Sequence, residues 1–430
     1  MKLINFQKKM WEKIKTWILI TFLGLVFIAS GLIINAIQAC IYLTIRKVNK
    51  DLYRRINYYL IYSSWSQIVA LTEWWSGTTC RLIAADEDTL KNFSKEHALV
   101  VMNHKYDVDW LMCWLICDKL NMLGSAKTFS KSSLRKVPVI GWSWIFADMI
   151  FLERNWERDS LVLGQKLDEL MKYKETVLIL LFCEGTRFTP EKHKASMEYA
   201  RQKNLAELKY HLLPRTKGFN YCVQHLKNKT QAIYDIEIAF PETPKPTMLN
   251  ILFGRKLIGD MYVRRIPIQE IPIDSDEECS KWLHELYQRK DKIMEEYLQT
   301  GKFPGKYIEF SRRPYPIINI IFWSLVVGTP FIYGLWLMFL SGNTVVIMIA
   351  WTLVITVMTG VYLLVRVTKA DKGSAYGKTS PTTALPKTSD ETKVKLVEGS
   401  VAMETIPETA EDQDNLNIPN GHINDEVRVS

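Results

Sequence analysis

One histidine and one aspartate, His104 and Asp109, lie just after an apolar run and could together move a proton. Imidazole can accept a proton from a hydroxyl group near neutral pH, and a carboxylate on its other ring nitrogen fixes the tautomer and stabilises the imidazolium. Residues five apart on one helix point to different faces, so the two side chains meet only if the backbone turns between them. The pair alone is weak evidence for catalysis, because an aspartate N-cap beside a surface histidine would produce the same sequence pattern.

The residues around this pair supply the turn. Residues 98–102 are apolar and partly β-branched, which indicates a buried strand. Residues 103–109 are mostly polar, and an apolar segment of helical character follows them. A strand that ends in a turn before a helix presents side chains at a sheet edge, where α/β proteins bind ligands.

Two further stretches indicate strands. Residues 177–182 form an apolar run that ends in a polar loop, as at His104, and residues 235–240 alternate after Leu213-Pro214 has broken a basic helical stretch. Residues 282–298 have the pattern of a charged amphipathic helix, which we interpret as a solvated packing helix. Strands interleaved with helical segments indicate an α/β domain.

The composition narrows the class of partner. A net charge of +9 and a pI of about 9.0 suit an anionic membrane surface or anionic substrates. No RRM, KH, zinc-finger or basic-zipper pattern accompanies this charge, so we predict no nucleic-acid partner. The seven cysteines are scattered and form no C-x-x-C pair, which indicates reduced thiols facing the cytosol. Cys113 and Cys117 lie one helical turn apart, and we interpret them as small core residues, not as metal ligands.

Apolar segments near both ends predict membrane helices. Residues 17–44 contain no charge and are too long for a signal-peptide core, so they predict a retained membrane helix, whose direction the basic residues on both sides leave undecided. Residues 58–75 are aromatic-rich and amphipathic and suit the membrane interface. Residues 316–340 and 345–365 predict a transmembrane hairpin, and basic residues outside both ends place its tip in the lumen. Residues from 370 onward are polar and predict a disordered tail.

Four short blocks follow one another in a fixed order: Asn103-His104-x4-Asp109, IFLER at 150–154, EGTR at 184–187, and LPRTKG at 213–218. Together they resemble the glycerolipid acyltransferase family over roughly residues 95–310. The wording CEGTRFT, KYHLLPRTKGF and DKGSAYGK is most similar to its gamma/delta type of 1-acylglycerol-3-phosphate acyltransferase. The second block departs from the family pattern, because Glu153 stands where an aspartate is usual, but the charge is kept.

The resemblance implies an α/β acyltransferase domain with a mixed sheet flanked by helices, between an N-terminal membrane region and a C-terminal transmembrane hairpin. We divide the chain into membrane-anchoring helices (1–76), the catalytic domain (77–309), the hairpin (310–368) and the tail (369–430). Residues 123–154 contain an apolar run, but Asp148 interrupts it and the resemblance places it inside the catalytic domain. We therefore predict no membrane span there.

The resemblance also implies a reaction in which acyl-CoA donates its acyl chain to the hydroxyl of lysophosphatidic acid, without a cofactor or metal. His104 would act as general base and Asp109 would hold its ring. The residues that the resemblance associates with substrate binding are Arg187 as the first phosphate ligand, Arg154 and Lys127 on the acceptor, Glu184, Gly185 and Thr186 in the same loop as Arg187, and Pro214 on the acyl-donor side. Gly185 would allow close backbone approach in this loop, and Glu184 could anchor the loop or orient Arg187. A plain helix stop remains an equal interpretation of Pro214.

Other functions fit parts of the pattern. The acceptor could be another lysophospholipid or glycerol 3-phosphate, and water in place of a lipid hydroxyl would make the protein a thioesterase. A non-catalytic membrane scaffold would not need His104. We expect a multi-pass protein of the endoplasmic reticulum or another endomembrane, with the lipid bilayer as a partner and the catalytic domain facing the cytosol. The sequons at Asn92 and Asn228 should then carry no glycan.

Overall fold

The computed structural model of the chain describes residues 2–153, 155–241 and 244–368. The predicted tail and the DKGSAYGK segment therefore lie outside the described residues. The strands are β1 (Thr79–Ala84), β2 (Ala98–Met102), β3 (Lys127–Lys131), β4 (Ile150–Leu152), β5 (Leu178–Leu181), β6 (Ala232–Ala239), β7 (Ile258–Pro267) and β8 (Lys306–Ile308). The predicted strands at 98–102, 177–182 and 235–240 are confirmed as β2, β5 and β6, with small differences at the ends of the last two.

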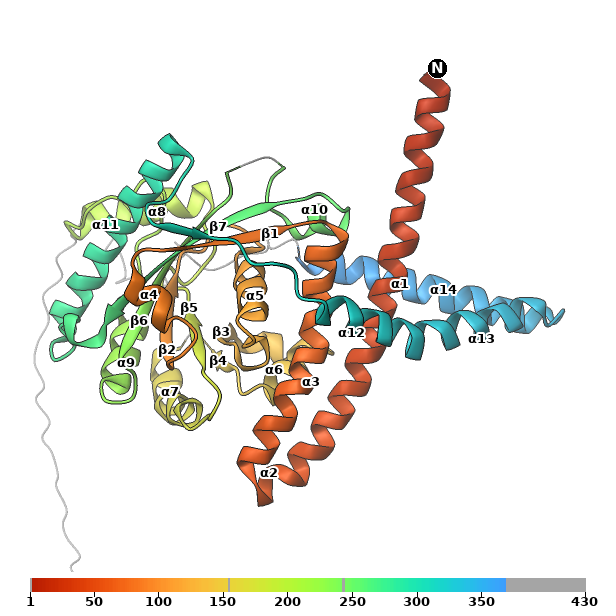
Figure 1. Cartoon of the computed structure of the whole chain (residues 1–430), viewed down its shortest axis with the longest axis horizontal. Helices are drawn as coiled ribbons and strands as arrows, with labels where there is room; N and C mark the ends of the chain where they lie inside the picture. The colour runs from red at the N-terminus through yellow and green to blue at the C-terminus, as the bar shows by residue number, and fades with distance from the viewer. Residues whose placement is uncertain (1, 154, 242–243, 369–430) are drawn as a thin grey trace, which may run out of the picture. The chain divides into compact units, whose positions relative to one another are not determined.

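The strands form one mixed sheet in the order β4-β3-β5-β2-β6-β7-β1-β8 (Figure 1). Most neighbours run parallel, whereas β6 pairs with β7, and β1 with β8, in antiparallel register. The helices of this domain are α4 (Glu87–Asn92), α5 (Asp109–Lys119), α6 (Ile140–Phe146), α7 (Trp156–Met171), α8 (Pro190–Gln202), α9 (Thr216–Leu226), α10 (Met248–Leu252) and α11 (Asp276–Thr300). The α/β domain with a mixed sheet flanked by helices is confirmed.

β2 lies inside the sheet and is buried on both faces, which explains its unbroken apolar sequence. Val100 and Met102 pack on one face, in a core shared with α5 and with α3 (Lys50–Ala70). Leu99 and Val101 pack on the other face, against α7, α9 and α11. This two-sided packing fixes where β2 ends and therefore where the residues after Met102 emerge.

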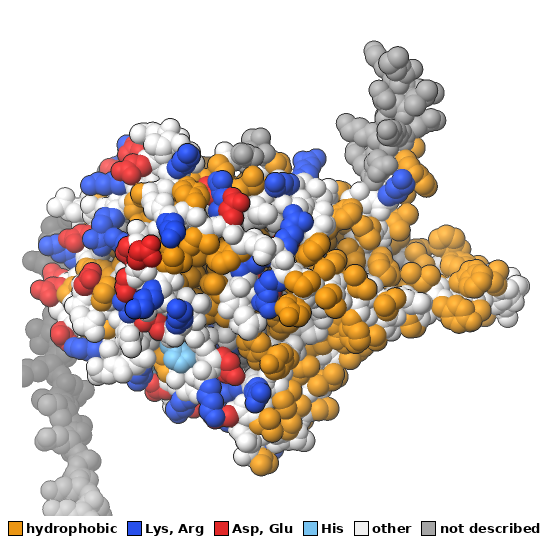
Figure 2. All heavy atoms as spheres, in the orientation of Figure 1, with side chains coloured by type: hydrophobic (Ala, Val, Ile, Leu, Met, Phe, Trp, Pro, Cys, Tyr) orange, Lys and Arg blue, Asp and Glu red, His pale blue; other side chains and the backbone are white. Residues whose placement is uncertain are grey.

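Three helical segments are long and apolar enough to cross a membrane: Ile14–Val48, Tyr315–Leu340 and Thr344–Leu363. They are built from α1 (Lys2–Leu43), α2 (Ile45–Val48), α12 (Tyr315–Trp323), the π-helical turn η5 (Ser324–Gly328), α13 (Thr329–Leu340) and α14 (Thr344–Thr368). Pro330 has no backbone N–H to donate to the preceding turn, which accounts for the π-helical turn before it. Figure 2 shows apolar side chains gathered over α1 and α12 to α14, and charged ones over the sheet domain.

The segment 123–154 is not among these spans. It forms β3, α6, β4 and two short 3-10 turns inside the sheet domain, so the prediction of no membrane helix there is confirmed. The amphipathic segment 58–75 is the second part of α3 and the π-helical turn η1 (Leu71–Trp75). Polar contacts join α3 to α1 and α12: Gln67 Nε2 donates to Ser30 Oγ at 2.9 Å, and Asn319 Nδ2 donates to the Ser63 carbonyl at 2.7 Å.

The interpretation of residues 282–298 as a solvated packing helix is wrong in one respect. They lie within α11, and one face of α11 carries charged groups into the interior: Lys290 is 1% exposed and donates to Asp235 of β6 at 2.8 Å. The helical periodicity shows which face is buried, but it does not show that a charged residue on that face has a buried partner.

Candidate active site

His104 and Asp109 meet at the carboxyl end of β2, as the sequence predicts. His104 Nδ1 lies 3.2 Å from Asp109 Oδ2, and the same oxygen accepts the backbone N–H groups of Lys105 and Tyr106, each at 2.7 Å. The turn between β2 and α5 is therefore wrapped around one carboxylate, which is the first residue of α5. Burial raises the pKa of Asp109, and the hydrogen bonds from His104 and from the two backbone groups only partly oppose it.

The position of the ring leaves one nitrogen for chemistry. An ionised carboxylate only accepts hydrogen bonds, so Nδ1 carries the hydrogen and Nε2 has a free lone pair. His104 stacks on Phe182 with ring centroids 4.2 Å apart and lines a cavity of about 1220 Å³. In the described part of the chain, no protein group hydrogen-bonds to Nε2. This arrangement can remove a proton from a hydroxyl group bound in the cavity.

Neighbouring loops fix the backbone of the His104 turn. The Asn103 side chain both donates to the Ile238 carbonyl at 3.0 Å and accepts the Ile238 N–H at 2.9 Å, which joins the end of β2 to β6. The Phe188 N–H donates to the His104 carbonyl at 2.8 Å. The turn is therefore held from the two strands that flank β2, since Phe188 lies in the loop after β5.

Glu184 lies behind the site and does not line the cavity, so the structure gives it the role of an anchor for the loop and not that of a substrate ligand. Its carboxylate is 1% exposed; Oε1 accepts the His104 N–H at 2.9 Å, and Oε2 accepts the Leu212 N–H at 3.2 Å. The next residue, Gly185, has a φ of +68°, which favours glycine. A Cβ there would lie 2.8 Å from Arg215 Cδ, so Gly185 also permits close packing of two loops.

Basic side chains gather where the loops after β3 and β5 and the residues before α9 face the cavity. Lys192 Nζ donates to Thr186 Oγ1 at 2.9 Å and to the Arg187 carbonyl at 3.1 Å. The basic residues that line the cavity are Lys127, Lys131, Arg187, Lys192, Arg215 and Lys217. Sequence reasoning had given Lys192 and Lys131 no role. The structure identifies them because both lie at the edge where β2 and β5 end.

Lys127 lies deeper than its predicted role requires. Lys127 pairs with Ile179, which in turn pairs with Leu99, the second residue of β2. Lys127 is therefore four residues, or about 13 Å at about 3.3 Å per residue, from the edge of the sheet where His104 lies. Its Nζ has no hydrogen-bond partner in the described residues and lies 5.0 Å from the centre of the Tyr173 ring. Burial lowers the pKa of Lys127 to about 8. A phosphate close to the reacting hydroxyl would therefore meet Lys131, at the end of β3, sooner than Lys127.

Pro214 lines the cavity two residues before α9 begins. The helix-stop interpretation is wrong, because α8 ends at Gln202 and no helix runs directly into Pro214. The following residue, Arg215, donates its N–H to the Cys183 carbonyl at 2.7 Å, which joins this segment to the loop after β5. Arg154 lies outside the described residues.

The inner part of the cavity is apolar. Its walls include Trp110 and Trp114 of α5, Trp65 of α3, Phe27 of α1 and Leu180 of β5, so it extends from the sheet edge to the N-terminal helices. Cys113 and Cys117 also face it from α5 as small side chains. The described residues contain no group of three histidine, cysteine or acidic side chains that could hold a metal ion.

A histidine and a carboxylate at the edge of a mixed sheet, beside an apolar cavity with a basic rim, define an α/β domain suited to acyl transfer between lipid-like substrates. The family models agree with this class: the one described as Acyltransferase matches residues 84–239, and the one described as Acyltransferase C-terminus matches residues 250–323. The first ends with β6, and the second runs from α10 to α12.

The chain belongs to the family of 1-acyl-sn-glycerol-3-phosphate acyltransferases. It is 44% identical over 354 residues to the gamma type of Homo sapiens, an alignment that covers 82% of this chain and 93% of that protein. It is 46% identical over 352 residues to the delta type of Homo sapiens, covering 82% of this chain and 92% of that protein. The delta type of Rattus norvegicus is also 46% identical over 352 residues, with the same coverage. The expected resemblance is confirmed.

Proposed function

We propose that the protein transfers an acyl chain from acyl-CoA to the free hydroxyl of 1-acyl-sn-glycerol 3-phosphate, giving phosphatidic acid and free CoA. The names of its relatives support this acceptor. The observation that carries the proposal is the His104–Asp109 pair, which lies where a basic rim meets an apolar cavity. The rim suits a phosphate, and the cavity suits an acyl chain.

In the proposed mechanism, His104 Nε2 takes the proton of the acceptor hydroxyl while the oxygen attacks the thioester carbonyl. Asp109 stabilises the imidazolium that forms. The tetrahedral intermediate then collapses, the carbon–sulfur bond breaks, and the imidazolium returns its proton to the CoA thiolate. No enzyme-bound acyl group is needed. A general base supplies roughly a hundred- to ten-thousand-fold, so positioning and stabilisation of the oxyanion supply the remainder.

The acceptor phosphate is assigned to the rim formed by Arg187, Lys192 and Lys131. Arg187 is the first candidate, because its planar guanidinium can bind two phosphate oxygens at once. Lys192 donates to Thr186 and to the Arg187 backbone, which orders the loop that carries Arg187. Thr186 and Gly185 then serve the loop geometry, and Pro214 lies at the mouth of the cavity beside them.

The membrane arrangement belongs to the same proposal. Ile14–Val48 would anchor the N-terminus, and Tyr315–Leu340 with Thr344–Leu363 would form a hairpin whose tip is lumenal. The catalytic domain, residues 77–309, would then face the cytosol of the endoplasmic reticulum or a related membrane, where acyl-CoA is supplied. The acyl chain would occupy the apolar part of the cavity, which reaches the N-terminal helices.

A transfer assay with a panel of acceptors tests the proposal. The purified full-length protein, in detergent or vesicles, is given labelled acyl-CoA with lysophosphatidic acid, glycerol 3-phosphate or lysophosphatidylcholine. We expect acylated product with lysophosphatidic acid, and its loss in His104→Ala with membrane insertion intact. Preference for another acceptor, or release of fatty acid without lipid product, would refute the proposed reaction.

The role of Arg187 is tested with the same acceptors. Loss of its charge-assisted hydrogen bonds, worth roughly 1.5–3 kcal/mol, should lower transfer efficiency in Arg187→Ala by about ten- to a hundred-fold. Arg187→Lys keeps the charge but loses the planar geometry, so it should recover only part of the loss. The loss should be larger with lysophosphatidic acid than with lysophosphatidylcholine, whose phosphate is masked. Equal losses would assign Arg187 to the fold or to CoA.

A further inference from the structure

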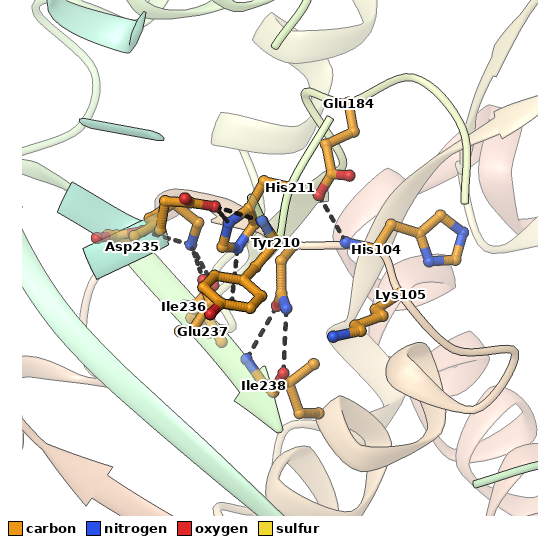
Figure 3. Close-up of polar contacts among 12 residues, drawn as sticks. His104, Lys105, Glu184, Tyr210, His211, Asp235, Ile236, Glu237 and Ile238 are labelled. Carbon is orange, nitrogen blue, oxygen red and sulfur yellow. Dashed lines mark hydrogen bonds and ion pairs between the residues drawn. The ribbon is translucent and has the colours of Figure 1, made fainter. Parts of the chain in front are cut away.

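Buried charged side chains gather directly behind the His104 turn, and the mechanism above uses none of them (Figure 3). β6 contributes Asp235 and Glu237, α11 contributes Lys290 and Asp291, and the segment between α8 and α9 contributes His211. Burial of so many charges is costly unless each is paired. The arrangement of these pairs shows which charge acts on the active-site loop.

His211 is held as a cation by its two neighbours. It is 1% exposed; its Nδ1 lies 2.9 Å from Asp291 Oδ1, and its Nε2 lies 2.9 Å from Glu237 Oε1. Carboxylates only accept hydrogen bonds, so both ring nitrogens carry hydrogen. Burial alone would lower the pKa of His211, but the two carboxylates outweigh it and raise this pKa to about 9. The side chain is therefore an imidazolium at neutral pH.

Glu184 needs such a charge nearby. Its two oxygens accept backbone N–H groups, one from His104 and one from Leu212, the residue that follows His211. In the described part of the chain, no cationic side chain pairs with Glu184 directly. Burial raises the pKa of Glu184 to about 7, and the positive charge of His211 acts against this effect. Protonation would put a hydrogen on one carboxyl oxygen and weaken one of the two bonds, because a protonated oxygen is a poor acceptor.

Lys290 makes its own contacts with the carboxylates of β6. It donates to Asp235 at 2.8 Å and to the Ile236 carbonyl at 2.6 Å, and it lies 3.0 Å from Glu237 Oε2. Arg264 of β7 also lies 3.2 Å from Asp235 Oδ2, so Lys290 and Arg264 together balance the two carboxylates of β6. His211, whose ring nitrogens are paired with Asp291 and Glu237, brings a further positive charge next in sequence to Leu212, which donates to Glu184.

We propose that His211 is a positioning residue: its imidazolium favours the ionised form of Glu184, and the ionised Glu184 holds the His104 backbone so that the ring stays between Asp109 and the acceptor hydroxyl. Figure 3 shows the second part of this link, with the Glu184 carboxylate on the His104 backbone N–H and the His104 ring directed away from it. This inference rests on the proposed function, because the ring is positioned for that reaction.

The pH dependence that follows involves a defined set of groups. Those that face His211 and Glu184 are His104 from the turn after β2, Cys183 from the loop after β5, Asp235 and Glu237 from β6, and Tyr287, Lys290 and Asp291 from α11. Removal of the positive charge of His211 favours the protonated form of Glu184. The acidic limb of the rate profile should therefore move to higher pH.

The test is the pH profile of kcat at saturating acyl-CoA and lysophosphatidic acid, measured with the full-length protein. We expect His211→Gln to move the acidic limb upward by about one pH unit, the effect of one nearby charge. The KM for acyl-CoA should stay unchanged, since His211 does not touch the cavity. In a Glu184→Gln background, where nothing titrates at that position, His211→Gln should cause no shift.

A matched control is His225→Gln. His225 of α9 also pairs with a carboxylate, Asp168 of α7, at 2.9 Å, and its variant should keep the wild-type profile. A loss of rate by the same factor at every pH in His211→Gln would overturn the inference. A shift that persists in the Glu184→Gln background would overturn the route through Glu184.

Two further measurements keep the inference testable if His211→Gln does not fold. Asp291→Asn removes one of the two carboxylates and should move the acidic limb in the same direction by a smaller amount. Infrared difference spectra, with Glu184→Gln as reference, report the protonation of Glu184 without any turnover. A carboxylic-acid band of Glu184 that grows as the pH falls through about 7 supports the inference, and a band that is already complete at higher pH overturns it. Failure of the wild type to acylate any acceptor would instead refute the proposed function.

Discussion

Replacement of Asp109 by asparagine separates the catalytic from the structural role of the buried carboxylate. At the 3.2 Å that separates Oδ2 from His104 Nδ1, an imidazolium and a carboxylate attract each other by about 5 kcal/mol at an effective dielectric constant of about 20. An amide oxygen keeps a neutral hydrogen bond worth about 1 kcal/mol. The difference raises the barrier by roughly 3–4 kcal/mol, so kcat should fall by about a hundred- to a thousand-fold.

The stability of Asp109→Asn should not fall with its activity. Burial raises the pKa of Asp109 in the folded protein, so the folded state holds the proton more tightly than the unfolded state does. The charged carboxylate then lowers stability at neutral pH, and protonation restores it as the pH falls through the folded pKa. Neutral asparagine avoids this cost, so the variant should have an equal or higher Tm at pH 7, and the difference should vanish in acid.

The assay compares kcat and Tm for wild type, Asp109→Asn and Asp107→Asn. Asp107 is the matched control, because it is the other carboxylate of the turn and lines the cavity. Burial raises the pKa of Asp107, and the positive charge of Arg187 opposes this rise. Because Arg187 is the proposed ligand of the acceptor phosphate, Asp107→Asn should mainly change acceptor binding. A larger loss of kcat in Asp107→Asn than in Asp109→Asn would refute the pairing of His104 with Asp109.

Three other changes test separate parts of the structure. Gly185→Ala should lose transfer activity, because its Cβ would lie 2.8 Å from an arginine side chain, whereas Gly218→Ala, with nothing within 4 Å, should keep activity. Lys127→Met should raise the free energy of unfolding by up to about 3 kcal/mol below pH 8, because burial lowers the pKa of Lys127 to about 8 in the folded protein. The gain should shrink as the pH rises toward the pKa of lysine in the unfolded chain. An unchanged unfolding midpoint in urea would contradict this prediction. Enzymatic deglycosylation should cause no mass shift at Asn92 or Asn228, and a shift at either would reverse the proposed orientation of the domain.

The local elements of the fold follow from the sequence because their signals are local. An apolar run buried on both faces predicted β2 to the residue, and the change to polar residues after Met102 predicted the turn. Spacing alone showed that His104 and Asp109 need this turn to meet. The prediction that Pro214 ends a helix is wrong, because Pro214 comes before α9 and α8 ends earlier, at Gln202.

What the sequence could not show depends on contacts between distant segments. The resemblance places Glu184 in a block associated with substrate, yet its two oxygens are used by backbone groups that lie 80 and 28 positions away in the chain. Lys127 and Lys131 differ by four positions, and only the register of β3 against β5 tells which one reaches the edge. The sequence does not show that His211 is charged, because its two carboxylate partners come from β6 and α11, which are distant in the chain.

The antiparallel pairing of β1 with β8 limits how the enzyme can move in its proposed setting. β1 follows α3 and η1, β8 comes before α12, and Leu82 and Ile308 lie side by side in the register. If the helices on either side span the bilayer as proposed, the catalytic domain is tied to it twice, at one edge of its sheet, and cannot rotate about a single tether. In that arrangement the cavity would keep one orientation toward the lipids, and the acceptor would reach it by diffusion within the bilayer. A cut between β8 and α12 would therefore slow turnover on vesicles far more than on monomeric lipid in detergent.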